Sequence, residues 1–185
     1  AEMNANSRLE VDEGDRIALL HSDTTDGRFC ADCIKAHYES KGIRCSLKEI
    51  GSLGLGANKF TNGLKALVHK AITLKKEAES SYLKPVFNAT GGFKAEIAFL
   101  NLLGALLGGE VVYIFEAHSE LVTLPKLPLD WDTNFVLENK AFFDWIDSEP
   151  RKESEVRSWL MSKPELEALV EKDNDGNMYL TAAGD

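Results

Sequence analysis

The segment best suited to binding an anion runs from Asn88 to Lys94 and reads Asn-Ala-Thr-Gly-Gly-Phe-Lys. It lies between a short apolar run, which predicts a strand, and a long apolar run, which predicts a helix. Gly91 and Gly92 let the backbone approach a ligand, the first N–H groups of the helix face an anion, and Lys94 adds a positive charge. Asn88 and Thr90 could orient a ribose or a base. The alternative is a tight turn that needs glycine for its geometry alone.

A second polar segment, Ser22 to Arg28, also follows an apolar run. In a parallel sheet the carboxyl ends of the strands lie at one edge, so both segments are expected to face the same crevice. Thr25 or Asp26 is expected to cap the next helix, and capping is the favoured role of Asp26, which leaves Ser22 and Thr24 as ligand candidates. Neither segment has the spacing of a P-loop or of a dinucleotide-binding G-x-G-x-x-G.

Three residues, Cys30, Cys33 and His37, fall on one face of a predicted helix. Together they resemble the start of a metal site, but a structural zinc site needs four ligands and Cys45 does not complete one convincingly. A buried helix face with small cysteines is the simpler interpretation. We therefore predict no metal and no obligatory disulfide. A lysine-rich helix face at 59–76 is interpreted as a solvated surface.

The elements that must position these residues alternate along the chain. Short apolar runs predict strands at 16–20, 43–50, 85–87 and 111–115. Helical periodicity predicts helices at 26–41, from 58 onward and at 93–107. Strands that alternate with long helices favour parallel strands joined by crossover helices. The predicted fold class is α/β, with a Rossmann-like, doubly wound, mostly parallel sheet over residues 1–148.

Beyond residue 116 the character of the chain changes, because prolines at 125 and 128 exclude the interior of a sheet. A helix is predicted from Thr133 to Pro150. Two short helices, a turn at 173–176 and a strand at 178–181 then predict a small winged-helix-like segment over residues 149–185, cut short at its end. Residues 141–175 hold ten acidic and five basic side chains, which is the wrong sign for binding duplex DNA.

The composition excludes several classes of protein. The 185 residues carry a formal net charge of −9, so there is no long-range basic field for duplex DNA or for an anionic membrane. The apolar stretches are too short to cross a bilayer, and the first fifteen residues are polar and acidic rather than a secretory signal. Three cysteines fit a reducing cytoplasm, where we expect the protein to be located.

The run NATGGFKAEIAFLNLLGALLGGEVVYIFE (88–116), with SDTTDGRFCAD before it and LVTLPKLPLDWD after it, resembles the CARF-domain proteins of type III CRISPR systems. It is most similar to their short branch, which includes the cyclic-oligoadenylate ring nucleases. The resemblance covers about residues 10–148, and its most specific part is the T-G-G-F-K block. It implies a Rossmann-like homodimer that binds a ring of linked adenylates across its two-fold axis, without a cofactor.

The resemblance also implies roles for individual residues. Asn88, Thr90, Gly91, Gly92 and Phe93 would line the ligand site. Lys94 would contact the scissile phosphate and stabilise its developing charge, which makes it the candidate catalytic residue.

One departure from the family concerns the first strand, which normally ends in a hydroxyl-bearing loop at the ligand. Nothing before Arg16 has the pattern of that strand, so the domain is expected to lack it or to have diverged there. The favoured function is a sensor of cyclic oligoadenylate, of undetermined ring size, that regulates antiviral defence through a carboxyl-terminal effector absent from this chain. The alternatives are a metal-independent ring nuclease, acting through attack by a ribose 2′-hydroxyl, and an ordinary mononucleotide-binding α/β domain.

Overall fold

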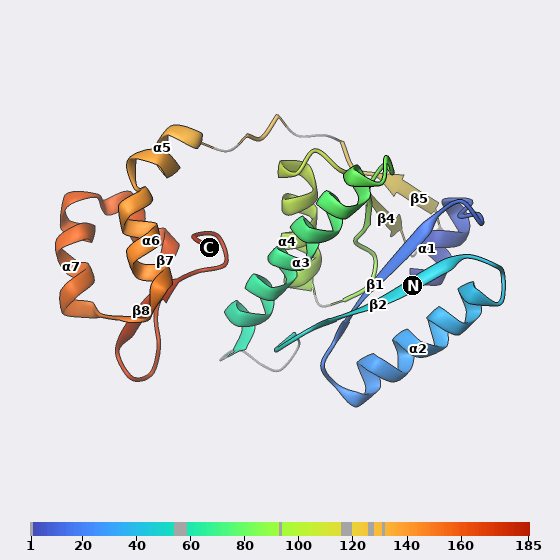
Figure 1. Ribbon diagram of the computed structural model, residues 1–185, viewed down its shortest axis with the longest axis horizontal. Coiled ribbons are helices and arrows are strands. Elements are labelled where there is room, and N and C mark those ends of the chain that lie inside the picture. The colour runs from blue at the N-terminus through green and yellow to red at the C-terminus, as the bar shows by residue number, and fades with distance from the viewer. Residues whose placement is uncertain (1, 54–58, 93, 116–119, 126–127, 131) are drawn as a thin grey trace. The chain divides into compact units, whose positions relative to one another are not determined.

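The computed structural model describes residues 2–53, 59–92, 94–115, 120–125, 128–130 and 132–185 (Figure 1). The chain divides into two compact units, Ala1–Asp130 and Trp131–Asp185. This division lies before the boundary expected after residue 148. The reason is that Phe142 and Ile146, which precede that boundary, are buried in the core of the second unit.

The first two strands of the first unit, β1 (Arg16–Ser22) and β2 (Arg44–Ile50), pair in parallel. The helix between them, α2 (Thr25–Glu39), packs against both strands. Tyr38, Ile43 and Cys45 are the buried centre of this packing. The strand, helix and strand predicted for this part of the sequence are therefore present.

The long helix α3 (Phe60–Ser80) leads into a second sheet, which contains β3 (Val86–Asn88), β4 (Glu110–Phe115) and β5 (Glu120–Thr123). β3 and β4 are parallel, and α4 (Lys94–Leu106) joins them. Val68 and Ala71 of α3 pack with Leu103 of α4. The antiparallel strand β5 was not predicted, and it ends before the chain reaches Pro125.

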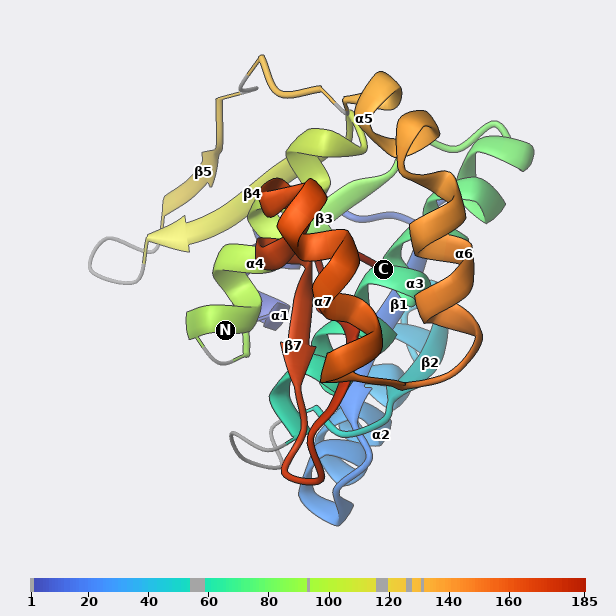
Figure 2. The same ribbon diagram turned by 90° about the vertical axis from the view of Figure 1, so that its left-hand side faces the viewer.

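The parallel strands lie in two sheets, β1–β2 and β3–β4–β5, rather than in the single sheet that the sequence predicted. In both views β1 lies between β2 and the β3–β4 pair (Figures 1 and 2). The strand residues beside this division are incompletely covered, since Ala18 of β1 and Val86 of β3 are both exposed. The local pattern specified the individual strands but not their assembly into one sheet.

A short helix that the sequence analysis did not predict, α1 (Glu2–Arg8), contacts β3, β4 and β5. Ala5 is fully buried in this contact and Asn6 is 8% exposed. Because α1 is mostly polar, its sequence has no apolar pattern that would indicate the burial of Ala5 and Asn6.

The second unit contains α5 (Thr133–Glu138), α6 (Lys140–Ser148) and α7 (Glu153–Ser162), followed by a 3-10 helix, η2 (Pro164–Leu169). Its small sheet has the order β6 (Arg151–Lys152), β8 (Asn177–Leu180), β7 (Val170–Lys172), all antiparallel. The single helix predicted from Thr133 to Pro150 is wrong, because Asn139 separates α5 from α6. The Asn139 side chain is nearly buried and donates to the Phe135 carbonyl at 2.8 Å.

The second unit has its own buried core, which is mainly aliphatic around Phe142 and has partly buried aromatic side chains packed against it. Phe142, Val156 and Leu166 are fully buried, and Trp145 stacks on Trp159 with ring centroids 6.3 Å apart. Figure 2 shows α7 beside the strands of the small sheet.

Among the described residues, no helix combines the length and the apolar character that crossing a bilayer requires.

Candidate functional site

The loop after β1 is organised around the hydroxyl groups of Ser22 and Thr24, whose oxygens lie 2.7 Å apart. Thr24 is the N-cap of α2, because its hydroxyl oxygen accepts a hydrogen bond from the Gly27 backbone at 3.1 Å. A Cβ at Gly27 would lie 2.2 Å from the Ser22 hydroxyl oxygen, so a larger residue here would displace the paired hydroxyl groups. The capping role predicted for Asp26 is therefore wrong. Asp26 lies in the first turn of α2, where a carboxylate is favourable without capping.

A hydrogen bond joins this loop to the loop after β2. The Ser52 backbone N–H donates to the Asp23 carboxylate at 3.0 Å. Ser52 has a φ of 64°, an uncommon backbone conformation for a residue other than glycine. The carboxyl ends of β1 and β2 are thus held together by a side chain.

The turn after β3 is fixed by the side chains of Asn88 and Thr90. The Asn88 amide donates to the Asn6 side chain of α1 at 2.9 Å, and its oxygen accepts from the Thr90 backbone at 3.2 Å. Thr90 is 6% exposed, and its hydroxyl oxygen accepts from the Ile114 backbone of β4 at 3.1 Å. Both side chains predicted to contact a ligand therefore also hold the turn in place.

After this turn the chain exposes the groups best placed to meet an anion. Gly91 is half-buried, and Gly92 is exposed with a φ of 115°, which favours glycine. Phe93, a predicted ligand residue, lies outside the described residues. Lys94 is the first residue of α4, and its side chain is exposed, with no hydrogen bond or ion pair to the described part of the chain.

A residue that the sequence analysis missed, Glu96, lies in the first turn of α4 and is only 8% exposed. A Cβ on Gly92 would lie 3.5 Å from its carboxylate oxygen, so the carboxylate is next to the turn. A carboxylate at a helix N-terminus is favourable, and here it partly satisfies the positive end of α4. An anion at this turn would then depend more on Lys94 than on the helix dipole. A single acidic residue within an apolar run was the available signal.

The second missed residue is His21, which precedes Ser22 at the end of β1 and is 6% exposed. Its Nδ1 lies 2.8 Å from the Ser22 carbonyl oxygen and must carry the hydrogen of that bond. Its Nε2 is buried and has no hydrogen-bond partner among the residues that the structure describes. An unsatisfied buried ring nitrogen is unusual beside a candidate binding loop.

These residues form two groups, one after β1 and one after β3, on two different sheets. In Figure 1 the carboxyl ends of β1, β2 and β3 lie on the same side of the first unit as the first turns of α3 and α4. No hydrogen bond joins Ser22 or Thr24 to Asn88 or Thr90 within the described residues. The predicted common edge is supported by this arrangement, whereas no hydrogen bond links the described residues of the two groups.

The cysteines differ from the prediction of a buried helix face. Cys30 and Cys33 are exposed on α2, beside Phe29, which is 67% exposed. Of the three cysteines, only Cys45 is buried. Its burial, and to a smaller extent the negative charge of Glu39, raises the pKa of its thiol. In the described part of the chain, no group of three or more histidine, cysteine or acidic side chains is arranged to hold a metal.

The arrangement provides a backbone turn, an exposed lysine and hydroxyl groups. It contains no hydrogen-bonded pair of nucleophile and base among the described residues of the two loops. Such a site can bind an anion electrostatically and stabilise developing negative charge on it.

Comparisons with known proteins add a family and a similar structure. The model of the family described as "CRISPR-associated protein (Cas_APE2256)" matches residues 1–127. A solved structure with similarity is Can2 from Sulfobacillus thermosulfidooxidans in complex with cyclic tetra-adenylate, with 10% sequence identity and a TM-score of 0.43. The match covers 90% of this chain and 52% of that one, so the chain spans about half the length of the structure that it matches.

Proposed function

Because this chain belongs to the CRISPR-associated Cas_APE2256 family, we propose that it is a CARF protein that binds cyclic oligoadenylate and regulates antiviral defence. The observation that carries the proposal is the turn after β3. There, Gly91 and Gly92 bring the backbone to the surface, and the exposed Lys94 has no partner among the described residues. An acidic protein can bind a polyanionic ring in this way, because each charge-assisted hydrogen bond contributes about 1.5 to 3 kcal/mol.

The proposed ligand site includes a second copy of the chain. α4 exposes an apolar stripe of Ala95, Ala98 and Leu102, and Leu102 is 46% exposed. These positions share one helix face that continues from Lys94. Two copies paired through this stripe would present the turn after β3 twice, as a ring of repeating chemistry requires. Light scattering on the protein with and without cyclic tetra-adenylate tests this homodimer, and a monomer in both samples would contradict it.

The proposed domain also includes a further parallel strand between β1 and β3. A two-stranded parallel sheet is unusual by itself, because parallel sheets are normally wide and covered on both faces. A strand in this position would pair with both free edges and join the two sheets into the doubly wound sheet that the sequence predicts.

The order of elements in the second unit, from α6 to β8, supports its assignment as a winged-helix-like segment.

The second candidate function is a ring nuclease that cleaves the same ligand without metal. The exposed Lys94 favours it, since an ammonium beside the scissile phosphate can stabilise the charge that develops as a ribose 2′-hydroxyl attacks. In that step the O2′–P bond forms and the P–O5′ bond breaks, which leaves a 2′,3′-cyclic phosphate and a 5′-hydroxyl. The 2′-hydroxyl proton passes to solvent, and the departing O5′ takes a proton from solvent. The third candidate is a site for a single mononucleotide.

The deciding experiment incubates the protein with cyclic tetra-adenylate, cyclic hexa-adenylate and AMP in EDTA. Calorimetry measures binding, and chromatography follows linear products. Binding of either ring without products supports the sensor, and linear products support the nuclease. Failure of both rings to bind would overturn both candidates, and binding of AMP that is lost in Lys94→Ala would favour the mononucleotide domain. A cytoplasmic location and regulation through a carboxyl-terminal effector stay predictions.

A further inference from the structure

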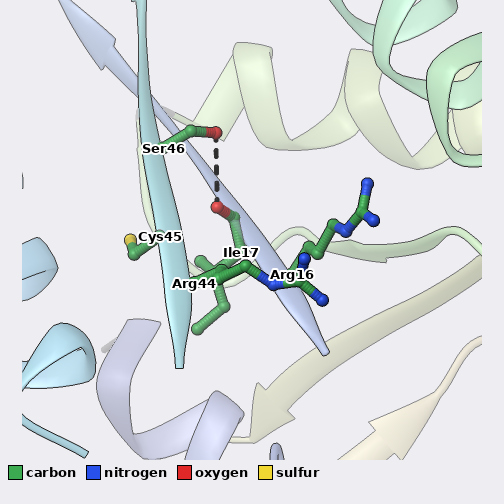
Figure 3. Close-up of a pocket in the computed structure, with 5 residues that line it drawn as sticks. All are labelled: Arg16, Ile17, Arg44, Cys45 and Ser46. Atoms are coloured by element: carbon green, nitrogen blue, oxygen red, sulfur yellow. Dashed lines mark hydrogen bonds between the residues drawn. The ribbon is translucent and has the colours of Figure 1, made fainter. Parts of the chain in front are cut away.

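Two arginines, Arg16 and Arg44, are register partners at the first positions of β1 and β2. Neighbouring strands lie about 4.8 Å apart, so paired residues project side by side from one face of the sheet. Figure 3 shows both guanidinium groups on the same side, away from the Cys45 side chain. Both arginines are exposed.

No carboxylate neutralises this pair in the part of the chain that the structure describes. Among the described residues, the Arg16 side chain makes one polar contact, from Nη1 to the Ser81 hydroxyl at 3.5 Å, and the Arg44 side chain makes none. Asp12 and Asp15, which precede β1, accept hydrogen bonds from the backbone of their own loop. Like charges directly opposite on neighbouring strands are destabilising. The unpaired arginines are notable because the chain has 30 acidic residues.

The two arginines line a pocket with Ile17, Cys45 and Ser46 (Figure 3). Its volume is about 150 Å³, which is enough for a group of several non-hydrogen atoms. The Ser46 hydroxyl is on the same face as the arginines, and within the described part of the chain it makes one long contact, 3.4 Å, with the Ile17 carbonyl. The pocket thus combines two fixed charges with a hydroxyl donor.

We propose that Arg16, Arg44 and Ser46 form a binding site for a phosphate dianion. A guanidinium group donates two parallel hydrogen bonds to phosphate oxygens, and two such groups would neutralise the charge of a phosphate monoester. The phosphate would in turn relieve the repulsion between the arginines. The bound dianion is either inorganic phosphate or the terminal phosphate of a nucleotide.

This site is separate from the proposed ring site. Six residues of extended strand separate Arg16 from Ser22, which is roughly 20 Å at about 3.3 Å per residue. Arg16 and Arg44 lie at the amino ends of their strands, whereas the proposed ring site lies at the carboxyl ends.

The test measures thermal unfolding of the 185-residue protein in sodium phosphate and in sodium chloride of matched ionic strength. We expect phosphate to raise the melting temperature of the wild type with a saturable dependence on concentration. Arg44→Gln should weaken this dependence at least tenfold. Arg157→Gln, in the second unit, removes the same charge and should leave the phosphate dependence unchanged.

Without phosphate, Arg44→Gln should leave the melting temperature unchanged or raise it, because a repulsion is removed. A lower melting temperature in chloride combined with an unchanged phosphate response would overturn the proposal and assign Arg44 a packing role. A response that never saturates and is equal in all variants would also overturn it, because it would report a general salt effect.

The two sources of phosphate are distinguished by AMP, with adenosine as its control. Equal affinity for AMP and inorganic phosphate would show that the site recognises phosphate alone. Tighter binding of AMP would show that its ligand is a nucleotide. Binding of adenosine would contradict an anion site. Lys94→Ala separates this site from the ring site. The phosphate response should survive in Lys94→Ala, and binding of cyclic tetra-adenylate should survive in Arg44→Gln.

Discussion

The hydroxyl oxygen of Thr90 lies 3.1 Å from the backbone nitrogen of Ile114 and accepts its hydrogen bond in the interior of the first unit. This contact connects the turn after β3 to the neighbouring strand β4. A residue at the centre of the proposed ligand site is therefore also part of the fold, and its two roles can be separated by experiment.

We expect Thr90→Val to lower the free energy of unfolding by about 1 to 3 kcal/mol, because it leaves the buried Ile114 N–H without an acceptor. Thr90→Ser keeps the hydroxyl and should retain most of the stability. All three tryptophans lie in residues 131–185, so the measurement is urea unfolding followed by far-UV circular dichroism rather than by tryptophan fluorescence. Equal stability of the two variants would show that the hydrogen bond contributes little.

Lys94→Ala should weaken binding of the adenylate ring by about 10- to 150-fold, equivalent to about 1.5 to 3 kcal/mol, and should leave folding intact. If the protein cleaves the ring, the single-turnover rate at saturating ligand should fall by a further factor on the order of 10² to 10³. Lys76→Ala, an exposed lysine of α3, is the matched control. Unchanged binding and cleavage in Lys94→Ala would leave the backbone of Gly91 and Gly92 as the anion site.

The three thiols should differ in reactivity. Cys30 and Cys33 are exposed and should react with a disulfide reagent at once, whereas Cys45 is buried and its raised pKa lowers the fraction of reactive thiolate. A folded sample should therefore show two fast thiols and a third that reacts after denaturation. Cys45→Ala should remove only the slow phase. Stoichiometric zinc in the purified protein would contradict the prediction that these cysteines bind no metal.

The second unit should lose stability in acid through Asp173. Hydrogen bonds from the Asn177 side chain and backbone, and then from the Asp175 backbone, lower the pKa of the Asp173 carboxyl. Because the folded-state pKa is the lower one, the stabilisation is complete above the unfolded-state pKa. This stabilisation is lost as the pH falls below about 4, near the unfolded-state pKa, and then through the lower folded-state pKa of the carboxyl. Tryptophan fluorescence should show a weaker acid dependence in Asp173→Asn, while Asp175→Asn should behave like the wild type.

The free edges of β1 and β3 should be visible in hydrogen exchange. Backbone amides of β1 that face away from β2 should exchange rapidly in the 185-residue chain, as should those on the free edge of β3. Pairing of the proposed further strand with both edges should slow exchange at the two edges together. Slow exchange at these amides in the 185-residue chain would argue against an unfilled position between the sheets.

The sequence by itself determined the local elements and the location of the candidate turn. The apolar runs and glycines around Asn88 to Lys94 specify a strand, a turn and a helix through short-range preferences, and the family resemblance covers the same residues. The parallel pairing of β1 with β2 and of β3 with β4 likewise agrees with the predicted alternation of strands and helices.

Only the tertiary structure decided which polar groups are already engaged. Thr24 rather than Asp26 caps α2, because the cap depends on where the hydroxyl lies relative to the Gly27 N–H. The pairing of Arg16 with Arg44 joins positions 28 residues apart, and the burial of Glu96 depends on what packs around its helix. Such facts depend on long-range contacts, which no local pattern of residues encodes.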